Sequence, residues 1–289
     1  MERELWPLLY RTVRDVARGF SQKYVQIPGW VVLLTMLWAA IHDRPVCWAC
    51  RPANWSTTRL RPPRLPSEAT MSRRVDGVAL GLLWRAVEER LRETGDPALL
   101  AFIDGKPLPV GGNSKDPDAR WGRSSGGLAK GYKLHAIWST GVLPVAWEVA
   151  PLNAHERKVG YELLGQLRHG GYLLGDGEYD ASYLYDRAWE RGYQLVAPYR
   201  KAKRPGKGNH YQSPHRLRSI AMLQRRFGEV LYQARRQIER SFGNATSFGG
   251  GLAPLPAWVR RLDRVRTWVW AKLLINAARI LIHKDLHHA

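Results

Sequence analysis

The sequence predicts an α/β protein in which a mixed sheet with flanking helices follows an all-α N-terminal region. Over residues 1–95, apolar side chains recur at the spacing of amphipathic helices. Over residues 96–289, short apolar runs typical of buried strands alternate with helical patterns, which is the order of a mixed sheet with helices on its faces. Because the chain has 289 residues and is 45% apolar, it can bury a substantial core in one large domain or two smaller ones.

The charge of the chain indicates a polyanionic partner. Lys and Arg number 45 against 25 Asp and Glu, which gives a formal net charge of +20. Such an excess repels itself in a compact protein unless nucleic acid or an anionic membrane offsets it. The longest apolar run, residues 29–41, is shorter than the roughly 18 residues of a membrane span and is expected to form a buried helix. DNA is therefore the expected partner, and no membrane contact is expected.

The two cysteines do not define a clear metal site. Few cysteines and an acidic, amphipathic N-terminus predict a cytoplasmic protein. Cys47 and Cys50 form a CxxC pair inside the Pro- and Arg-rich segment 44–66, which is expected to be a loop or linker. Zinc would need about two more ligands, and His42 is the candidate nearby, so a reduced structural pair is favoured over a metal or redox site.

Three helices are expected in the N-terminal region, of which the first and third have an apolar stripe. The second covers residues 30–42, and the third follows Ser67, a suitable N-cap, over residues 68–93. The apolar stripe of the first helix consists of Leu5, Leu8, Leu9, Val13, Val16 and Phe20, and that of the third consists of Val75, Val78, Ala79, Leu82, Leu83 and Ala86.

Two basic segments are candidates for contact with DNA. Residues 67–75 resemble the start of a helix-turn-helix recognition helix, with Arg73 and Arg74 near its exposed side; the alternative is a surface helix with solvated arginines. Residues 199–216 form either a solvated loop or a contact with the DNA backbone, and the overall charge favours the second. The cations of this loop expected to contact DNA are Lys201, Lys203, Arg204 and Lys207.

The second region is expected to contain five strands and several helices. A helix with Asn153 as its N-cap covers residues 153–169, and a second helix over residues 181–192 closes at Gly192. Residues 258–283 are expected to form a long amphipathic helix that packs on the core or on a second subunit. The expected strands are residues 98–104, 131–139, 143–150, 171–176 and 193–199.

Three acids are candidates for chemistry. Asp104 and Asp176 each follow an expected strand, at the carboxyl end where open α/β sheets bind ligands. Two carboxylates this close need a cation between them, and Mg²⁺ prefers such oxygen ligands. Glu239, on an expected helix, could complete a site for two Mg²⁺ ions, which would clamp the attacking and leaving oxygens of a phosphoryl transfer.

Each acid also has a structural interpretation. An isolated Asp after a strand is usually a turn residue or a helix cap. Glu178 and Asp180 are rivals to Asp176, although Asp180 is better suited to cap the helix that follows. Glu239 lies among Arg235, Arg236 and Arg240, so ion pairing is an alternative to metal binding.

The chain resembles the DDE transposases of bacterial insertion sequences. The resemblance covers about residues 98–283 and is carried by "IDGKPLPV" around Asp104, the segment 131–156, and "LLGDGEYDASYL" around Asp176. In the family signature Tyr-x₂-Arg-x₃-Glu-x₆-Lys, this chain has Tyr232, Arg235 and Glu239, with Thr246 in place of the Lys. His155 and Glu156 match loosely a position where such proteins often carry His and Asp.

The resemblance implies a ribonuclease-H-like fold and a catalytic triad of Asp104, Asp176 and Glu239. It also implies two Mg²⁺ ions, with Mn²⁺ as a substitute, and two DNA partners, the terminal inverted repeats of an element and the target. A homodimer in the DNA complex and a bacterial, nucleoid-associated location would follow. Tyr232, Arg235 and Arg240 are then expected to contact DNA, and the arginine fork suits phosphate. The alternatives are a nuclease without strand transfer and a non-catalytic, transposase-derived repressor.

Overall fold

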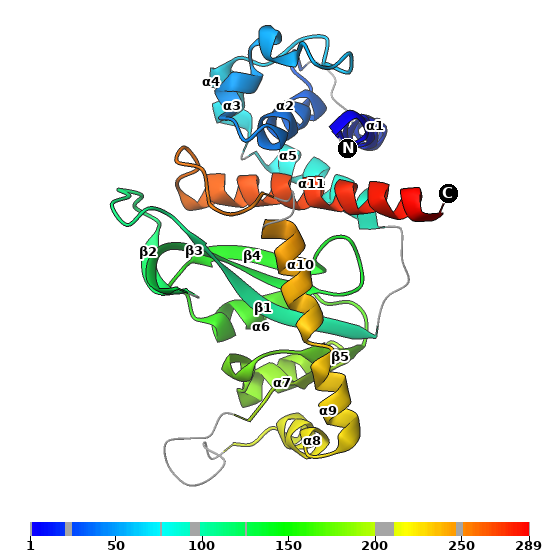
Figure 1. Ribbon diagram of the computed structural model, residues 1–289, viewed down its shortest axis with the longest axis vertical. Helices are drawn as coiled ribbons and strands as arrows, with labels where there is room; N and C mark the ends of the chain where they lie inside the picture. Colours follow the sequence, from blue (N-terminus) through cyan, green and yellow to red (C-terminus); the bar gives the residue numbers. More distant parts are fainter. Residues whose placement is uncertain are drawn as a thin grey trace. The chain divides into compact units, whose positions relative to one another are not determined.

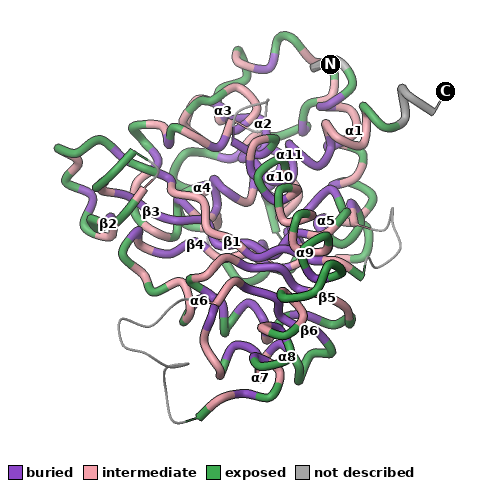
Figure 2. The backbone as a smooth tube through the Cα atoms, turned by 60° about the horizontal axis from the view of Figure 1, so that its bottom comes forward, coloured by how far each residue is buried: buried purple, intermediate pink, exposed green. Residues whose placement is uncertain are grey.

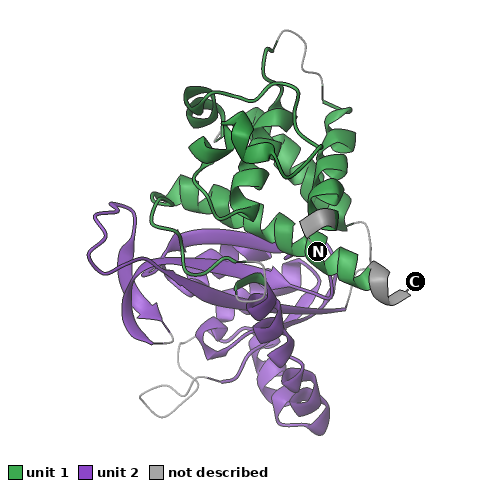
Figure 3. Cartoon of the chain, turned by 45° about the horizontal axis from the view of Figure 1, so that its top comes forward, with its two compact units in different colours: residues 1–94, 245–289 green, residues 95–244 purple. Residues whose placement is uncertain are grey.

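The computed structural model describes residues 2–20, 25–75, 77–92, 99–124, 126–199, 211–246 and 251–288 (Figure 1). The chain divides into two compact units, which are coloured separately in Figure 3. The first unit comprises residues 1–94 and 245–289, and the second comprises residues 95–244. Within the described ranges, every helix is too short or too polar to cross a membrane.

The first unit consists of helices. As predicted, α1 buries one apolar face, which includes Leu5, Leu9 and Val13, and α2 is almost entirely buried. Ser67 caps α4, because its hydroxyl accepts a hydrogen bond from the backbone N–H of Thr70. The elements of this unit are α1 (Glu2–Ala17), α2 (Gly29–Ile41), α3 (Val46–Ala49), the 3₁₀ helix η1 (Pro52–Trp55), α4 (Glu68–Arg74), α5 (Val78–Arg92) and α11 (Leu262–His288).

The Pro-rich segment 44–66, predicted to be a loop or linker, is helical in its first half, whereas residues 56–66 form neither helix nor strand. It contains α3 and η1, and Trp55 at the end of η1 is buried. Trp55 stacks on Trp38 with ring centroids 4.8 Å apart, and both rings contact Trp6. The indole N–H of Trp55 donates to the carbonyl of Ala49 (2.8 Å). Proline prevents this segment from forming longer helices. Ring packing and indole hydrogen bonds therefore hold it in place.

The CxxC pair lies at the end of α3, and both thiols are free. Burial, followed by the charge of Glu68 and by Cys47, raises the pKa of the Cys50 thiol to about 11. Among the residues that the structure describes, no cluster of three His, Cys, Asp or Glu side chains could hold a metal ion. The structural role of the pair stays a prediction.

The expected third helix is two helices, and its predicted face is wrong. α4 ends at Arg74, and α5 begins at Val78. Val78 and Leu82 of the predicted stripe are exposed. The face that is buried instead contains Trp84, whose ring stacks on Trp270 of α11 at 5.1 Å, and periodicity could not choose between two apolar stripes on one helix. The buried apolar residues of α5 are Leu80, Leu83, Trp84, Val87 and Leu91.

Helix α11 also differs from its prediction. Instead of one apolar stripe, it is buried around most of its circumference between Thr267 and Ala278. Lys272 is buried there and forms an ion pair with Asp43 (Nζ to Oδ1, 2.6 Å). The packing therefore groups α11 with the N-terminal helices, whereas the sequence pattern joined it to residues 96–289.

The second unit is built on a six-stranded mixed sheet in the order β4–β3–β1–β5–β6, with β2 on the same edge of β3 as β4 (Figure 1). β1 pairs antiparallel with β3, and β5 pairs parallel with both β1 and β6. β2 was not predicted, because its residues lack a continuous apolar run. The strands are β1 (Leu100–Pro109), β2 (Arg120–Ser124), β3 (Gly127–Trp138), β4 (Ala146–Pro151), β5 (Gly171–Leu174) and β6 (Tyr193–Val196).

The two faces of the sheet carry different helices. α6 (Glu156–Leu164) and α7 (Ser182–Glu190) cover one face, called the α6 face, where Ile103 and Ile137 lie in a single apolar cluster with side chains from both helices. Alternate residues point to the opposite face. There Trp138 meets Phe242 of α10 (Arg236–Thr246), with ring centroids 6.1 Å apart. Figure 2 shows the buried strands of the sheet in purple.

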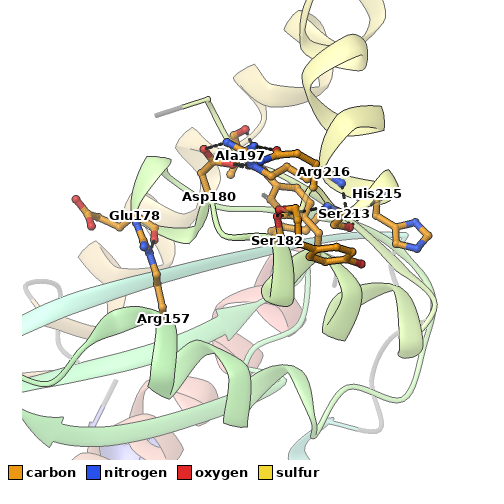
Figure 4. Close-up of polar contacts among 12 residues, drawn as sticks. Arg157, Glu178, Asp180, Ser182, Ala197, Ser213, His215 and Arg216 are labelled. Carbon is orange, nitrogen blue, oxygen red and sulfur yellow. Dashed lines mark hydrogen bonds and ion pairs between the residues drawn. The ribbon is translucent and has the colours of Figure 1, made fainter. Parts of the chain in front are cut away.

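Two predicted helix caps in this unit are wrong. α6 begins after His155, not at Asn153, and α7 begins after Ala181, not at Asp180. Asp180 is buried and instead forms a two-pronged ion pair with Arg216 of α8 (Pro214–Leu223), with Oδ1 to Nε 2.6 Å and Oδ2 to Nη2 2.8 Å (Figure 4). This pair joins α8 to the segment that follows β5. Gly192 closes α7 with φ +78°, as predicted for a glycine there.

Replacing Asp180 with Ala should lower the free energy of unfolding by about 3–5 kcal/mol, because it leaves the Arg216 guanidinium buried without its carboxylate. Urea unfolding of the full chain measures the loss. The matched control is Glu190→Ala on α7, which breaks the more exposed Arg187–Glu190 pair and should change stability far less. Equal losses in the two variants would contradict a stabilising role for the buried pair.

Candidate active site

Asp104 and Asp176 lie side by side along the sheet. β1 and β5 are parallel neighbours, and their last paired residues are Phe102 and Leu174. Asp104 and Asp176 each come two residues after this pair, so the register places the two aspartates next to each other. Phe102 and Asp104 point away from the α6 face, because Ile103 between them belongs to the apolar cluster on that face. The prediction that Asp104 ends its strand is wrong, because β1 continues to Pro109, but the register still places Asp104 beside Asp176.

Local hydrogen bonds hold both carboxylates. The backbone N–H of Gly105 donates to Asp104 Oδ1 (2.8 Å), and the backbone N–H of Glu178 donates to Asp176 Oδ1 (2.9 Å). The second bond starts the 3₁₀ turn η2 (Gly177–Tyr179). Asp176 therefore caps a turn as well as standing beside Asp104, while Glu178 is exposed and its carbonyl accepts from Arg157 Nε (2.7 Å; Figure 4). A capping role and a site role are compatible in one residue.

The segment with the Tyr-Arg-Glu signature reaches both aspartates. The hydroxyl of Tyr232 donates to the carbonyl of Gly175, the residue before Asp176 (3.1 Å). The guanidinium of Arg235 pairs with Asp104 (Nη2 to Oδ2, 3.0 Å). One signature residue therefore anchors this segment to the end of β5, and the next anchors it to β1.

The sequence places Glu239 on a helix, and in the structure the signature residues are divided between two helices and the turn that joins them. α9 (Arg226–Gln233) ends before Ala234, and α10 starts at Arg236. Arg235 lies in the turn between them, where its backbone N–H bonds the carbonyl of Tyr232 (3.0 Å). Arg235 therefore precedes the helix that carries Glu239.

Asp104 is a perturbed acid. Burial raises its pKa from the ordinary value to about 6, and the charges of Asp176 and Glu156 act in the same direction. The bond from Gly105 and the charge of Arg235 oppose this rise without cancelling it. Two acids and one arginine thus share a half-buried place in which one more positive charge would be stabilising.

Glu239 lies in the first turn of α10, one turn beyond Arg235. It is exposed, and within the described part of the chain it forms no ion pair, so the ion-pairing alternative is not what the structure shows. Nor do the described residues contain any three His, Cys, Asp or Glu side chains close enough to hold an ion together. The assignment of Glu239 as the third ligand stays a prediction.

Sequence reasoning missed the polar residues on the α6 face beneath the aspartates. Lys133 of β3 pairs with Glu156 at the start of α6 (Nζ to Oε1, 2.5 Å). His135, two residues along β3, is buried, and burial followed by the charge of Lys133 lowers its pKa to about 4. Tyr179 is buried on the same face, and burial, followed by the charges of Glu156, Asp104 and Asp176, raises its pKa. The available signal was Lys133 and His135 at alternate positions of an otherwise apolar strand.

The other residues predicted to contact DNA differ in how exposed they are. Arg240 and Arg73 are exposed, while the guanidinium of Arg74 donates to the carbonyl of Ile27 and is half-buried. Thr246, where the family has Lys, is buried at the end of α10. The DNA roles of all these residues stay predictions. Four further expected contacts lie outside the described residues, namely Lys201, Lys203, Arg204 and Lys207.

Comparison with known protein families agrees with this geometry. Residues 96–275 match the family described as Transposase DDE domain. The match covers more than half of the chain and includes both aspartates, Tyr232, Arg235 and Glu239, so the chain belongs to this family. Its ribonuclease-H-like mixed sheet is confirmed. Neither the curated proteins nor the solved structures contain a match to the chain.

The residues present fit a divalent cation. Asp104 and Asp176 supply the carboxylate oxygens that Mg²⁺ prefers, and the pKa of Asp104 is raised first by burial and then by the charges of Asp176 and Glu156. The family in general uses divalent metal ions.

Divalent-cation affinity should fall as the pH drops through about 6, because the cation competes with the proton on Asp104. The sign follows from the raised pKa, since below it the carboxyl is protonated and cannot bind metal. Titrating the chain with Mn²⁺ under electron paramagnetic resonance, from about pH 8 down to about pH 5, measures this loss. Unchanged affinity over that range would contradict it.

Proposed function

We propose that this transposase cuts DNA at the ends of its element and transfers the freed 3′-hydroxyl strand to target DNA. The observation that supports this most is that Tyr232 contacts Gly175, just after β5, while Arg235 contacts Asp104 on β1. These two signature residues converge on the paired acids Asp104 and Asp176, which is the arrangement that phosphodiester chemistry with cations requires.

In this proposal, Asp104, Asp176 and Glu239 hold the divalent cations. Two Mg²⁺ ions, with Mn²⁺ as a substitute, would activate water and stabilise the charge of the phosphoryl group. The protein contributes fixed carboxylates, which the backbone N–H groups of Gly105 and Glu178 hold in place before substrate arrives. Glu239, in the first turn of α10, has to approach the aspartates when the cations and DNA bind.

Arg235 has two partners in succession. In the cation-free chain its guanidinium offsets the charge of Asp104. Its Nε is buried and has no hydrogen-bond partner among the described residues. Once cations neutralise the aspartates, the planar fork can turn to a phosphate, for which its geometry is suited. Arg240 and Tyr232 would hold neighbouring parts of the backbone.

The partners follow from the reaction. Two element ends must be joined together, so we propose a homodimer bound to both terminal inverted repeats and to target DNA. The net charge of +20 supports tight contact with the backbone, and Arg73, Arg74 and the basic loop at 200–210 are candidates for it. A bacterial, nucleoid-associated protein in the cytoplasm fits this role. Short inverted repeats flanking the gene would identify the DNA substrate.

Two other functions remain as outcomes of the test. A nuclease of the same fold would cut DNA without joining it, and a transposase-derived repressor would bind DNA without catalysis. An assay that supplies pre-cleaved ends separates joining from cutting. Hydrolysis without joined product would favour the nuclease, and binding without either product would favour the repressor.

Asp104→Asn should lower both cleavage and strand transfer by about 10³-fold, because removal of a ligand charge forfeits several kcal/mol of transition-state stabilisation. DNA binding in a gel-shift assay should persist, since the basic surface is unchanged. Gel separation of cleaved and joined products measures the two steps. Full activity in this variant would remove the enzymatic proposal.

Glu239→Gln should abolish cleavage to a similar extent, as expected for the third ligand. Glu229→Gln is the matched control, because Glu229 is also an exposed acid in the first turn of the adjacent helix, α9. It should retain activity. If both variants cleave DNA as well as the unmodified chain, Glu239 is not a ligand and the triad is wrong, although the aspartate pair is untouched by that result.

A further inference from the structure

The hairpin of β2 and β3 lies at one end of the sheet, on the left in Figure 1, and two glycines anchor its base. A Cβ added to Gly122 of β2 would stand 2.5 Å from the carbonyl oxygen of Leu152, the residue directly after β4. A Cβ added to Gly131 of β3 would collide with the carbonyl of Leu108 on β1. Both strands of the hairpin therefore pass in close backbone contact with their neighbours, and the side chains they carry are held on a fixed frame.

One face of this hairpin combines an aromatic ring with cations. In the register, Trp121 is opposite Lys130, and Arg123 is opposite Leu128. Residues opposite each other, or two apart on one strand, lie on the same face of a sheet, so these four side chains share one face, here called the hairpin face. Trp121 is 53% exposed and Leu128 is 72% exposed, and Arg123 is exposed as well. The hairpin face contains no acidic residue.

The ring of Trp121 is open to a stacking partner. It makes no contact with another ring or with a cation among the described residues, whereas Trp138 contacts Phe242 and Trp189 stacks on His215. Apolar side chains that stay exposed on a surface rimmed by polar residues mark binding sites. The large apolar area of an indole makes such a site favourable for a flat ligand.

The cations of the hairpin face are available to a polyanion. Arg123 forms no ion pair within the described part of the chain. Lys130 donates to the carbonyl of Ser114 (Nζ to O, 2.6 Å), which leaves two of its three donors. Asp116, in the loop before β2, is buried and accepts from the hydroxyl of Tyr132 (2.7 Å), so its charge is turned inward. The charge presented at this face is therefore positive.

A stacking ring beside cations fits nucleic acid with unpaired bases. Aromatic side chains stack on the π-face of a base, while Lys and Arg neutralise the phosphates on either side. In an intact duplex both π-faces of a base are covered by its neighbours, so stacking requires a single strand or a base that has left the helix. Lys is depleted at protein–protein interfaces, which makes a second copy of the chain a poorer fit to this face.

The hairpin face lies on the same side of the sheet as Asp104. Asp104 is opposite Ala136 of β3, and Trp121 is opposite Lys130, an even number of residues along the same strand. At about 3.3 Å per residue, the two positions are about 20 Å apart along β3. A nucleic acid strand covers that distance in about six nucleotides, at about 3.4 Å each. One DNA molecule can therefore reach both places.

We propose that the hairpin face binds an unpaired stretch of the DNA substrate, with Trp121 stacked on a base and with Arg123 and Lys130 on the adjoining phosphates. This inference rests on the proposed function, because DNA held at Asp104 and Asp176 is what reaches the hairpin. None of the residues of the hairpin face belongs to the family signature or to the DNA contacts predicted from the sequence.

The test is equilibrium binding of the full chain to labelled oligo(dT) of about 15 nucleotides and to a blunt duplex of the same length, followed by fluorescence anisotropy. Trp121→Ala should weaken binding of the single strand by about 10-fold and binding of the duplex by less than twofold. Trp121→Phe keeps a stacking ring and should retain most of the affinity. The matched control is Trp189→Ala on α7, because Trp189 is similarly exposed but its ring already stacks on His215 (4.4 Å). The control should bind both DNAs like the unmodified chain.

A second variant tests the phosphate contact. Arg123→Gln should reduce the slope of log affinity against log salt concentration by about 0.7 for the single strand, as expected for the loss of one phosphate contact. An unchanged slope would remove Arg123 from the contact.

The results separate this inference from the proposed function. Single-strand affinity within twofold of the unmodified chain in Trp121→Ala, or equal losses on the single strand and the duplex, would overturn the inference while cutting and joining stand. Dissociation of a DNA-free dimer by Trp121→Ala, measured by analytical ultracentrifugation, would assign the face to a second copy and would also overturn it. An unmodified chain that binds the duplex but not the single strand contradicts the inference alone. If that chain binds neither DNA, the proposed function fails and the inference with it.

Discussion

The burial of the Asp104 carboxylate beside Asp176 is the constraint on which the rest of the site depends. The parallel pairing of β1 with β5 makes the two acids neighbours even though their like charges repel each other. Burial, and to a lesser extent the charge of Asp176, raises the pKa of Asp104 to about 6 because both disfavour the ionised carboxylate. Arg235 offsets only part of this charge. A divalent cation binds most favourably at a site of this kind, where carboxylate oxygens are half-buried and held in place.

The fold protects this arrangement from both faces of the sheet. On one face, Phe242 of α10 packs on Trp138 of β3, next to the strand that carries Asp104, and Arg235 pairs with Asp104 from the preceding turn. On the other face, Lys133 and Glu156 form a second ion pair. Arg235 is therefore the charge that favours the ionised form of Asp104, together with the hydrogen bond from Gly105, while Glu156 acts against it.

The apolar runs before Asp104 and Asp176 predict two strands that bring the acids together, although the end of the first strand was misplaced, since β1 continues to Pro109. The strands that carry Asp104 and Asp176 read clearly, and period-2 alternation gives their orientation. The contact of Arg235 with Asp104 could not be predicted, because it joins residues far apart in sequence through a turn between two helices that looked continuous. Tyr179 was missed since its phenol looks like ordinary core. The prediction of the buried face of α5 failed because the helix carries two apolar stripes.

The most direct test of the central claim is a crystal structure of the chain with Mn²⁺, in which anomalous scattering locates the metal. The account predicts a manganese peak between the carboxylates of Asp104 and Asp176, with the Arg235 guanidinium no longer bonded to Asp104. A structure at saturating Mn²⁺ that shows no peak there, and in which the Arg235–Asp104 pair is intact, would contradict it.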